Sequence, residues 1–173
     1  MAIRTILHYP DPRLREKAEP VQTITKEIQD LVDDMAETMY AAPGVGLAAT
    51  QIGENVRIFV IDIATADEPS QLCVFINPEI VEKDGEVCWE EGCLSFPSIH
   101  EEIKRAAKVK VKALGRDGKP FELEADGLLA VAIQHENDHL DGVLMIDRVG
   151  ALKKRMIQRK MQKRAAQGAD AEA

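Results

Sequence analysis

The chain has 173 residues, which suffices for one domain with a sizeable hydrophobic core and is short for two. Its 30 acidic and 22 basic residues give a net charge of −8. No apolar run approaches the ~20 residues of a membrane span, and proline and charge interrupt the N-terminus before a signal peptide could form. Three cysteines without a close CxxC pair argue against a disulfide framework. We therefore expect a cytoplasmic protein without a membrane partner.

The first part of the chain is expected to hold an extended lead followed by one helix. Three prolines favour a turn-rich course over residues 1–20. Over 25–41 apolar residues recur at helical spacing with charged residues between them, which predicts an amphipathic helix. The glycines over 43–53 then predict a loop. The apolar positions of the helix are Ile28, Leu31, Val32, Met35 and Met39.

Short β-branched runs separated by turn residues predict strands in the middle of the chain. Asp84-Gly85 and Asp117-Gly118 are dipeptides typical of tight hairpins, so each is expected to join two neighbouring strands. Around Val109 and Val111 apolar residues alternate with lysines, which indicates one buried and one solvent-facing side. The expected strands are 56–63, 72–76, 79–83, 86–89, 108–114 and 120–124.

Residues 134–139 read QHENDH and contain the pattern His-Glu-x-x-His, which is typical of a metal site on a helix. At about 3.6 residues per turn, His135 and His139 leave the same helix face and can bind one ion. Glu136 lies about 100° around the helix, close enough to reach a water on that ion but poorly aimed as a ligand. Two core histidines are the alternative interpretation.

The residues beside this pattern favour the metal site. The apolar run over 128–133 makes the segment a buried helix, in which His and Glu are costly to desolvate without a partner. Asp126 is suited to cap the N-terminus of this helix, and Gly142 is suited to end it.

Two histidines need a further partner, because a hydrolytic metal usually has three protein ligands and one open position. The candidate is Cys93, which follows a glycine in a strand-like segment that ends at Pro97. A lone cysteine is more often a small buried hydrophobic residue, so this alternative stays open on spacing alone. Asp138, or Arg105 paired with it, is a candidate for orienting a ligand, with a surface ion pair as the alternative.

Residues 151–164 are strongly basic, with seven Lys or Arg and no acid, whereas the rest of the chain is acidic. A thin apolar stripe of Leu152, Met156, Ile157 and Met161 predicts a helix there. It is either a solvated helix packed lightly on the body or a helix that docks to an RNA-rich surface. Residues 165–173 are small and polar and are expected to be disordered.

The order of elements predicts an α+β fold rather than alternating βαβ units. We expect antiparallel β-sheets packed around a central metal-binding helix, with an N-terminal helix and a C-terminal basic helix. Residues 1–150 are expected to form a catalytic metallohydrolase domain. The basic helix over 151–164 is expected to belong to the same domain.

Three motifs resemble those of the peptide deformylases, and of their bacterial type in particular. GVGLAATQ at 44–51 matches the family's GxGxAAxQ, EGCLS at 91–95 matches its cysteine motif, and QHENDH at 134–139 matches its QHExDH. They occur in the family's order and spacing, and similarity in the flanks extends through nearly the whole chain. The resemblance implies removal of the N-formyl group from the N-terminal methionine of nascent polypeptides, with release of formate.

The resemblance also implies roles for individual residues. Glu136 would activate a metal-bound water, and Gln51 and the backbone N–H of Leu94 would hold the oxyanion together with the metal. The metal ligands would be Cys93, His135 and His139.

An apolar slot beside the metal is expected to hold the methionine side chain, and loop backbone is expected to pair with the substrate as an added strand. Ordinary core packing is the alternative for the apolar residues. Many family members carry an arginine where His100 stands, which leaves a contact of His100 with the downstream peptide open. The slot residues are Leu128, Val131 and Ala132, and the backbone-pairing residues are Val45, Gly46 and Gly92.

The expected cofactor is one divalent metal ion. A Cys-His-His set with one water is compatible with zinc on ligand grounds, and Ni²⁺ is a further candidate. The resemblance implies Fe²⁺ as the physiological ion. It also implies the ribosome, near its exit site, as the partner of residues 151–164, and we expect a monomer.

Two other functions remain compatible with single motifs. A metallopeptidase that cleaves internal peptide bonds also uses His-Glu-x-x-His, but it usually completes the site with His or a carboxylate rather than a residue such as Cys93. A non-catalytic module could use the metal structurally and bind ribosomes through 151–164. Such a site normally has four ligands, and Cys88 is the candidate for the fourth.

Overall fold

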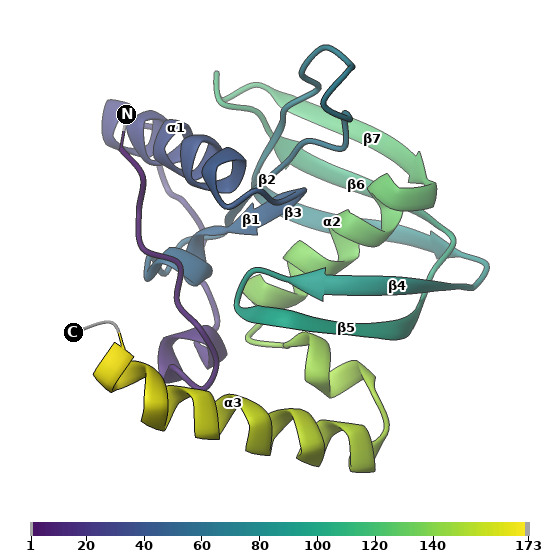
Figure 1. Cartoon of the computed structure of the whole chain (residues 1–173). Coiled ribbons are helices and arrows are strands. Elements are labelled where there is room, and N and C mark those ends of the chain that lie inside the picture. The colour runs from purple at the N-terminus through teal and green to yellow at the C-terminus, as the bar shows by residue number, and fades with distance from the viewer. Residues whose placement is uncertain (1, 172–173) are drawn as a thin grey trace.

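The computed structural model describes residues 2–171 and contains two antiparallel sheets with one helix, α2 (Gly127–Leu140), between them (Figure 1). On one side of α2, Ala130 and Ile133 pack into a buried cluster with the larger sheet. On the other side, His135 contacts the smaller sheet. The antiparallel pairing and the central helix confirm the expected α+β fold. Within residues 2–171 no helix is long and apolar enough to cross a membrane.

The larger sheet has five strands in the order β1-β2-β3-β6-β7, and the smaller sheet consists of β4 and β5. Every neighbouring pair is antiparallel. The alternation predicted around Val109 is present, because Val109 and Val111 are buried while Lys108 and Lys112 are exposed. The strands are β1 (Gly46–Ala48), β2 (Ile58–Ile61), β3 (Cys73–Asp84), β4 (Val87–Cys93), β5 (Phe96–Arg105), β6 (Lys108–Leu114) and β7 (Pro120–Asp126).

The amphipathic helix predicted over 25–41 is confirmed as α1. Thr25 caps it, since its hydroxyl accepts a hydrogen bond from the Ile28 N–H at 3.3 Å. Its buried face packs on β1 and β2 in a separate hydrophobic cluster. The helices of the described residues are α1 (Lys26–Ala41), α2 (Gly127–Leu140), α3 (Ala151–Ala171) and the short 3-10 helices η1 (Pro12–Arg15), η2 (Ala49–Ile52) and η3 (Met145–Arg148).

One of the two expected hairpins is wrong. At Asp84-Gly85 the chain turns, but β3 pairs with β6 as far as Asp84 opposite Lys108, and β4 pairs with β5 instead. Gly85, with φ +67°, therefore leads the chain from one sheet into the other. An Asp-Gly dipeptide indicates a turn, whereas the partner of a strand depends on residues elsewhere in the chain. The hairpin at Asp117-Gly118 is confirmed by the pairing of β6 with β7.

The basic C-terminal helix extends further than expected. The structure continues α3 to Ala171, and residues 172 and 173 lie outside the described part. The disorder expected for 165–173 stays a prediction. Alanine and glutamine are good helix formers and no proline interrupts the segment, so a helix that has begun can continue. Ile157 and Met161 are buried in one cluster with Phe96 of β5, which ties α3 to the body.

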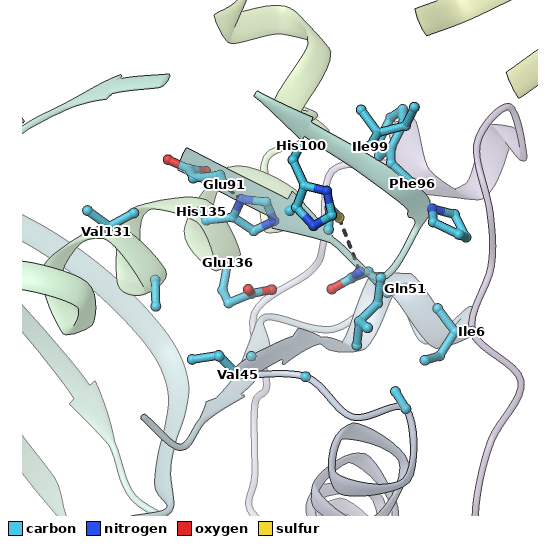
Figure 2. Close-up of a pocket in the computed structure, with 18 of the residues that line it drawn as sticks. Ile6, Val45, Gln51, Glu91, Phe96, Ile99, His100, Val131, His135 and Glu136 are labelled. Carbon is cyan, nitrogen blue, oxygen red and sulfur yellow. Dashed lines mark hydrogen bonds and ion pairs between the residues drawn. The ribbon is translucent and has the colours of Figure 1, made fainter. Parts of the chain in front are cut away.

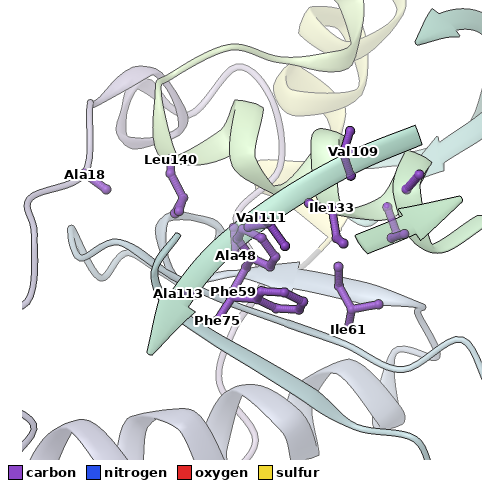
Figure 3. Packing of buried hydrophobic residues seen from close by; sticks show 13 residues of the cluster. Ala18, Ala48, Phe59, Ile61, Phe75, Val109, Val111, Ala113, Ile133 and Leu140 are labelled. Atoms are coloured by element: carbon purple, nitrogen blue, oxygen red, sulfur yellow. The ribbon is translucent and has the colours of Figure 1, made fainter. Parts of the chain in front are cut away.

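The core holds α2 in a fixed rotation against the larger sheet. Phe59 and Phe75 stack with ring centroids 4.7 Å apart, and Val111 and Ile133 lie beside them (Figure 3). Burial of each such side chain contributes about 1.5–3 kcal/mol. Because this face of α2 is held against the sheet, its polar face is directed toward β4 and β5.

Asp147 in η3 joins the N-terminal segment to α3. Its carboxylate pairs with Arg15 and accepts hydrogen bonds from Lys154 Nζ and the Leu144 N–H, each at 2.9 Å. Burial by itself would raise the pKa of Asp147, but these bonds, led by the one from Arg15, hold the pKa well below its ordinary value. The contribution of Asp147 to the stability of the fold is therefore complete above the ordinary pKa of an aspartate carboxyl group. It is lost as the pH falls through the lowered pKa of Asp147 in the folded protein.

Replacing Asp147 by Asn should lower the free energy of unfolding by about 1–2 kcal/mol at pH 7, because the partly exposed hydrogen bonds from Arg15, Lys154 and Leu144 lose the carboxylate charge. Urea unfolding measures the loss. The difference from the wild type should shrink below about pH 4, where the carboxyl of the unfolded chain is protonated. Asp67→Asn, in the exposed loop after β2, is the matched control. Equal stability of the wild type and Asp147→Asn at pH 7 would contradict the assignment.

Candidate metal centre and active site

α2 carries the two predicted histidine ligands together with Glu136. His135 and His139 lie one turn apart with ring centroids separated by 5.1 Å, and only 7% and 0% of the two residues is exposed. Asp126 occupies the N-cap position, although its side chain makes no capping hydrogen bond. Gly142, with φ +74°, follows the helix where any side chain would collide with the Arg15 backbone. The helix boundaries predicted from Asp126 and Gly142 are therefore correct.

Cys93, at the end of β4, faces the two histidines. Its Sγ lies 3.3 Å from His139 Nε2, and one donor atom from each of Cys93, His135 and His139 lies within 4.8 Å of the others. The structure thus brings together the three predicted ligands. Cys88 is exposed and stands outside this group, so the closed four-ligand site considered from the sequence is not formed.

Glu91 orients His135, a contact that sequence reasoning missed. His135 Nδ1 lies 2.9 Å from Glu91 Oε1, which leaves Nε2 of the same ring toward Cys93 and His139. The signal was present in the sequence, because Glu91 and Cys93 are two residues apart on a strand. Residues at that spacing point to the same face.

Arg105, the last residue of β5, holds Glu91 in place. Its guanidinium donates to both Glu91 oxygens at 2.7 and 2.9 Å and to Asp138 at 2.7 Å. Burial alone would raise the pKa of Glu91, but the hydrogen bonds from Arg105 and His135 outweigh it and keep the pKa below its ordinary value. The structure thus contains the pair of Arg105 with Asp138 that the sequence suggested. The same guanidinium holds Glu91, which in turn orients His135.

Glu136 lies beside the three ligands in a different environment. It is 5% exposed, and its Oε1 is buried without a hydrogen-bond partner. Burial raises the pKa of Glu136 to about 7. A Cβ added at Gly46 would lie 2.7 Å from Glu136 Oε2, so the absence of a side chain on β1 makes room for the carboxylate. Such a group is suited to accept and return a proton near neutral pH.

Gln51 reaches the site from η2, opposite α2. Its Nε2 lies 3.7 Å from Cys93 Sγ, and it donates to Ser95 Oγ at 3.0 Å. Leu94, directly after Cys93, lines the same cavity. Amide hydrogens from these two residues can therefore serve a group placed beside Cys93, as the sequence motifs implied.

One cavity of about 670 Å³ lies between β1, β4 and α2 (Figure 2). The side chains described above that border it are Gln51, Glu91, Cys93, Leu94, His135 and Glu136. A cavity of this size can take a small ligand or the end of a peptide. Sequence reasoning did not assign Trp89, His8 and Phe96 to this cavity. His100 also borders it. The predicted substrate residues on its wall are Val45, Gly46, Gly92, Leu128, Val131 and Ala132.

The donor set suits a divalent transition metal. One thiol and two imidazoles are the ligand types that Zn²⁺ and Fe²⁺ accept, and three protein ligands leave a position for substrate. Glu136 Oε1 is buried without a hydrogen-bond partner, and a water molecule on a bound ion would satisfy it. The residues present therefore fit a catalytic rather than a closed structural ion.

Comparison with known proteins agrees with this geometry. The polypeptide deformylase family profile matches residues 3–155. The chain belongs to the polypeptide deformylase family. A peptide deformylase of Chromobacterium violaceum is 56% identical over 167 residues, covering 96% of this chain and 99% of the relative. Family membership makes the chain a metal-dependent hydrolase that acts on N-formylmethionyl peptides.

Solved deformylase structures share the whole fold. The crystal structure of the Legionella pneumophila enzyme has a TM-score of 0.89 at 50% identity and covers 97% of this chain and 98% of that one. The Ehrlichia chaffeensis enzyme, in complex with actinonin, has a TM-score of 0.90 at 36% identity and covers 95% and 98%. The fold of this family member therefore matches the family along nearly its full length.

Replacing Glu91 by Gln should weaken metal binding about 10- to 100-fold, since His135 loses the charged acceptor that orients its ring. Competition with a chromophoric chelator measures the dissociation constant for Zn²⁺ or Co²⁺. Glu90→Gln is the matched control, because Glu90 is the exposed neighbour on the same strand. An unchanged dissociation constant for a folded Glu91→Gln variant would contradict the orienting role.

Proposed function

We propose that this chain hydrolyses the formyl group from the N-terminal methionine of nascent polypeptides at a divalent metal ion held by Cys93, His135 and His139. The observation that carries the proposal is the approach of their donor atoms to within 4.8 Å beside the buried Glu136. A divalent ion bound there supplies a Lewis acid for the formyl carbonyl and lowers the pKa of a water molecule.

Glu136 acts as the proton carrier. It takes a proton from the water whose oxygen bonds to the formyl carbon, and it gives a proton to the peptide nitrogen as the carbon–nitrogen bond breaks. The products are formate and a free amine. Its burial and its raised pKa, about 7, support this role, because the carboxyl can change protonation state near neutral pH.

Gln51 and the Leu94 backbone N–H stabilise the negative charge that develops on the formyl oxygen. The Gln51 amide stands next to Cys93, and η2 together with the turn after β4 fixes both donors before substrate arrives. Donors that are placed in advance cost no reorganisation during the reaction.

The cavity wall supports the proposed substrate orientation. Leu128, Val131 and Ala132 present apolar atoms of α2 near His135, where the methionine side chain would lie. β1 and β4 each end a sheet, so both have an edge free to pair with an extended peptide. Backbone groups for this pairing come from Val45, Gly46 and Gly92.

We propose Fe²⁺ as the physiological ion, with Zn²⁺ and Ni²⁺ as ions that the same ligands accept. Cys93 then becomes sensitive to oxygen, because a thiolate at such a site can be oxidised. Activity regained by ferrous iron without oxygen, and lost in air faster than with Ni²⁺, would support this choice.

The first experiment is formate release from N-formylmethionyl-alanine, with N-acetylmethionyl-alanine as control and protein prepared without oxygen. Glu136→Gln should lower kcat about 10²–10⁴-fold because it removes the proton carrier. The variant should still bind one metal ion, which titration with Co²⁺ would show. Wild-type turnover by Glu136→Gln would refute the role of Glu136, and no formate from the metal-loaded wild type would refute the function.

α3 is proposed to dock to ribosomal RNA near the exit site. Ile157 and Met161 face the body, while Arg155, Arg159, Lys160 and Lys163 are exposed. A cationic face of this kind gains affinity by releasing counterions from phosphates. Docking there would bring the active site close to newly made chains that carry the formyl group.

Changing Arg155, Arg159, Lys160 and Lys163 to Gln should weaken ribosome binding and make it less dependent on salt, with the slope of log K against log [salt] reduced by up to about 4. Formate release from a dipeptide should stay unchanged. Co-sedimentation at several salt concentrations measures the slope. A control variant with Lys108, Lys112 and Lys119 changed to Gln also loses exposed lysines, on and beside β6. If the α3 variant and the control variant bind ribosomes equally well, docking through α3 is contradicted.

A further inference from the structure

The orientation of the Gln51 side-chain amide is fixed by its neighbours. A backbone N–H can only donate, so the Ala48 N–H, 3.0 Å from Gln51 Oε1, identifies that atom as the oxygen. The Gln51 backbone oxygen accepts from the Leu7 N–H at 2.7 Å. Both the backbone and one end of the amide are therefore held by main-chain groups, and Nε2 must face the other way.

Ser95 holds the nitrogen end of this amide. Gln51 Nε2 donates to Ser95 Oγ at 3.0 Å, and Ser95 is fully buried in the turn between β4 and β5. The carbonyl oxygen of Ser95 in turn accepts from the Tyr9 N–H at 3.0 Å. The serine is thus itself tied to the N-terminal segment, so its hydroxyl has little freedom to follow a moving Gln51.

An amide nitrogen has two hydrogens, and Ser95 takes one of them. Nε2 also lies 3.7 Å from Cys93 Sγ, a contact that Figure 2 marks with a dashed line. The second hydrogen is therefore directed to the cavity beside Cys93. If the hydroxyl of Ser95 were absent, the amide could rotate about its last torsion and turn this hydrogen away.

We propose that Ser95 is a positioning residue, which aims the second N–H of Gln51, the one directed to the Cys93 side of the cavity, at the oxygen of the reacting formyl group. The inference rests on the proposed function, because it assigns Gln51 to the oxyanion. Ser95 does not touch the substrate, and its effect passes through Gln51 alone. Packing is the competing explanation for a fully buried serine, so the test must separate orientation from packing.

A double-mutant cycle separates them. Gln51→Ala should lower kcat about 10²–10³-fold, as loss of one oxyanion donor does. Ser95→Ala should lower kcat about tenfold with KM changed less than twofold, since the donor is present but poorly aimed. Gln51→Ala/Ser95→Ala should be no slower than Gln51→Ala, because the serine has nothing left to orient. Additive losses in the double variant would overturn the proposal.

A matched control shows what the loss of a buried, hydrogen-bonded hydroxyl costs when that hydroxyl lies outside the active site. Thr38 on α1 is 2% exposed, lies away from the cavity, and accepts from the Arg4 N–H at 2.8 Å. Thr38→Val should lower the melting temperature and leave kcat unchanged. A kcat loss of the same size as that of Ser95→Ala would overturn the proposal.

A readout without turnover distinguishes failure of this inference from failure of the proposed function. In amide NMR spectra of the uniformly ¹⁵N-labelled, Zn²⁺-loaded protein, the Gln51 side-chain signals are assigned by their loss in Gln51→Glu. The proton bonded to Ser95 should shift upfield in Ser95→Ala, and the two protons should become more alike. Unchanged signals would refute the orienting role even if formate is released. If the wild type releases no formate, the proposed function is refuted. A change of the Gln51 side-chain signals in Ser95→Ala would still support the contact between Gln51 and Ser95.

Discussion

The buried guanidinium of Arg105 is the interaction on which the active site depends. Its side chain is 4% exposed and joins β5 to Glu91 of β4 and to Asp138 of α2. Taking such charges out of water is costly, and good geometry with several hydrogen bonds offsets the cost. Arg148 adds a pair with Asp138 at 2.8 Å and extends the network to η3. The smaller sheet and the metal-binding helix therefore stay in register, and Glu91 stays aimed at His135.

What the sequence predicts correctly is what depends on nearby residues. The spacing of His135 and His139 gives a shared helix face at any position in a fold, and α1 follows from the same periodicity. The partner of β3 depends on residues 108–114, so no turn signal at Asp84-Gly85 could reveal it. The spacing of Glu91 from Cys93 places the two residues on one strand face, but it could not name the partners of Glu91, because Arg105 and His135 are 14 and 44 residues away.

Close approach of Gly46 to α2, and of Gly44 to the turn between β4 and β5, explains why the cavity wall has backbone rather than side chains at these two points. A Cβ at Gly46 would meet Glu136 Oε2 at 2.7 Å, and a Cβ at Gly44 would meet Leu94 Cδ1 at 2.7 Å. Close approach of main chain leaves peptide groups, not side chains, next to the reacting atoms. A side chain at Gly46 would displace the Glu136 carboxylate, and one at Gly44 would displace the Leu94 side chain, although neither glycine carries any chemistry.

Two buried carboxylates near the same histidines have different properties because their partners differ. Glu91 is 5% exposed, like Glu136, but Arg105 and His135 donate to it, which keeps its pKa low and its charge permanent. Glu136 has one oxygen without any donor, and burial raises its pKa to about 7. A permanent negative charge suits the support of a metal ligand, whereas a group that changes its protonation state suits proton transfer. The position of one arginine thus decides which carboxylate supports the ligand and which is free to move a proton.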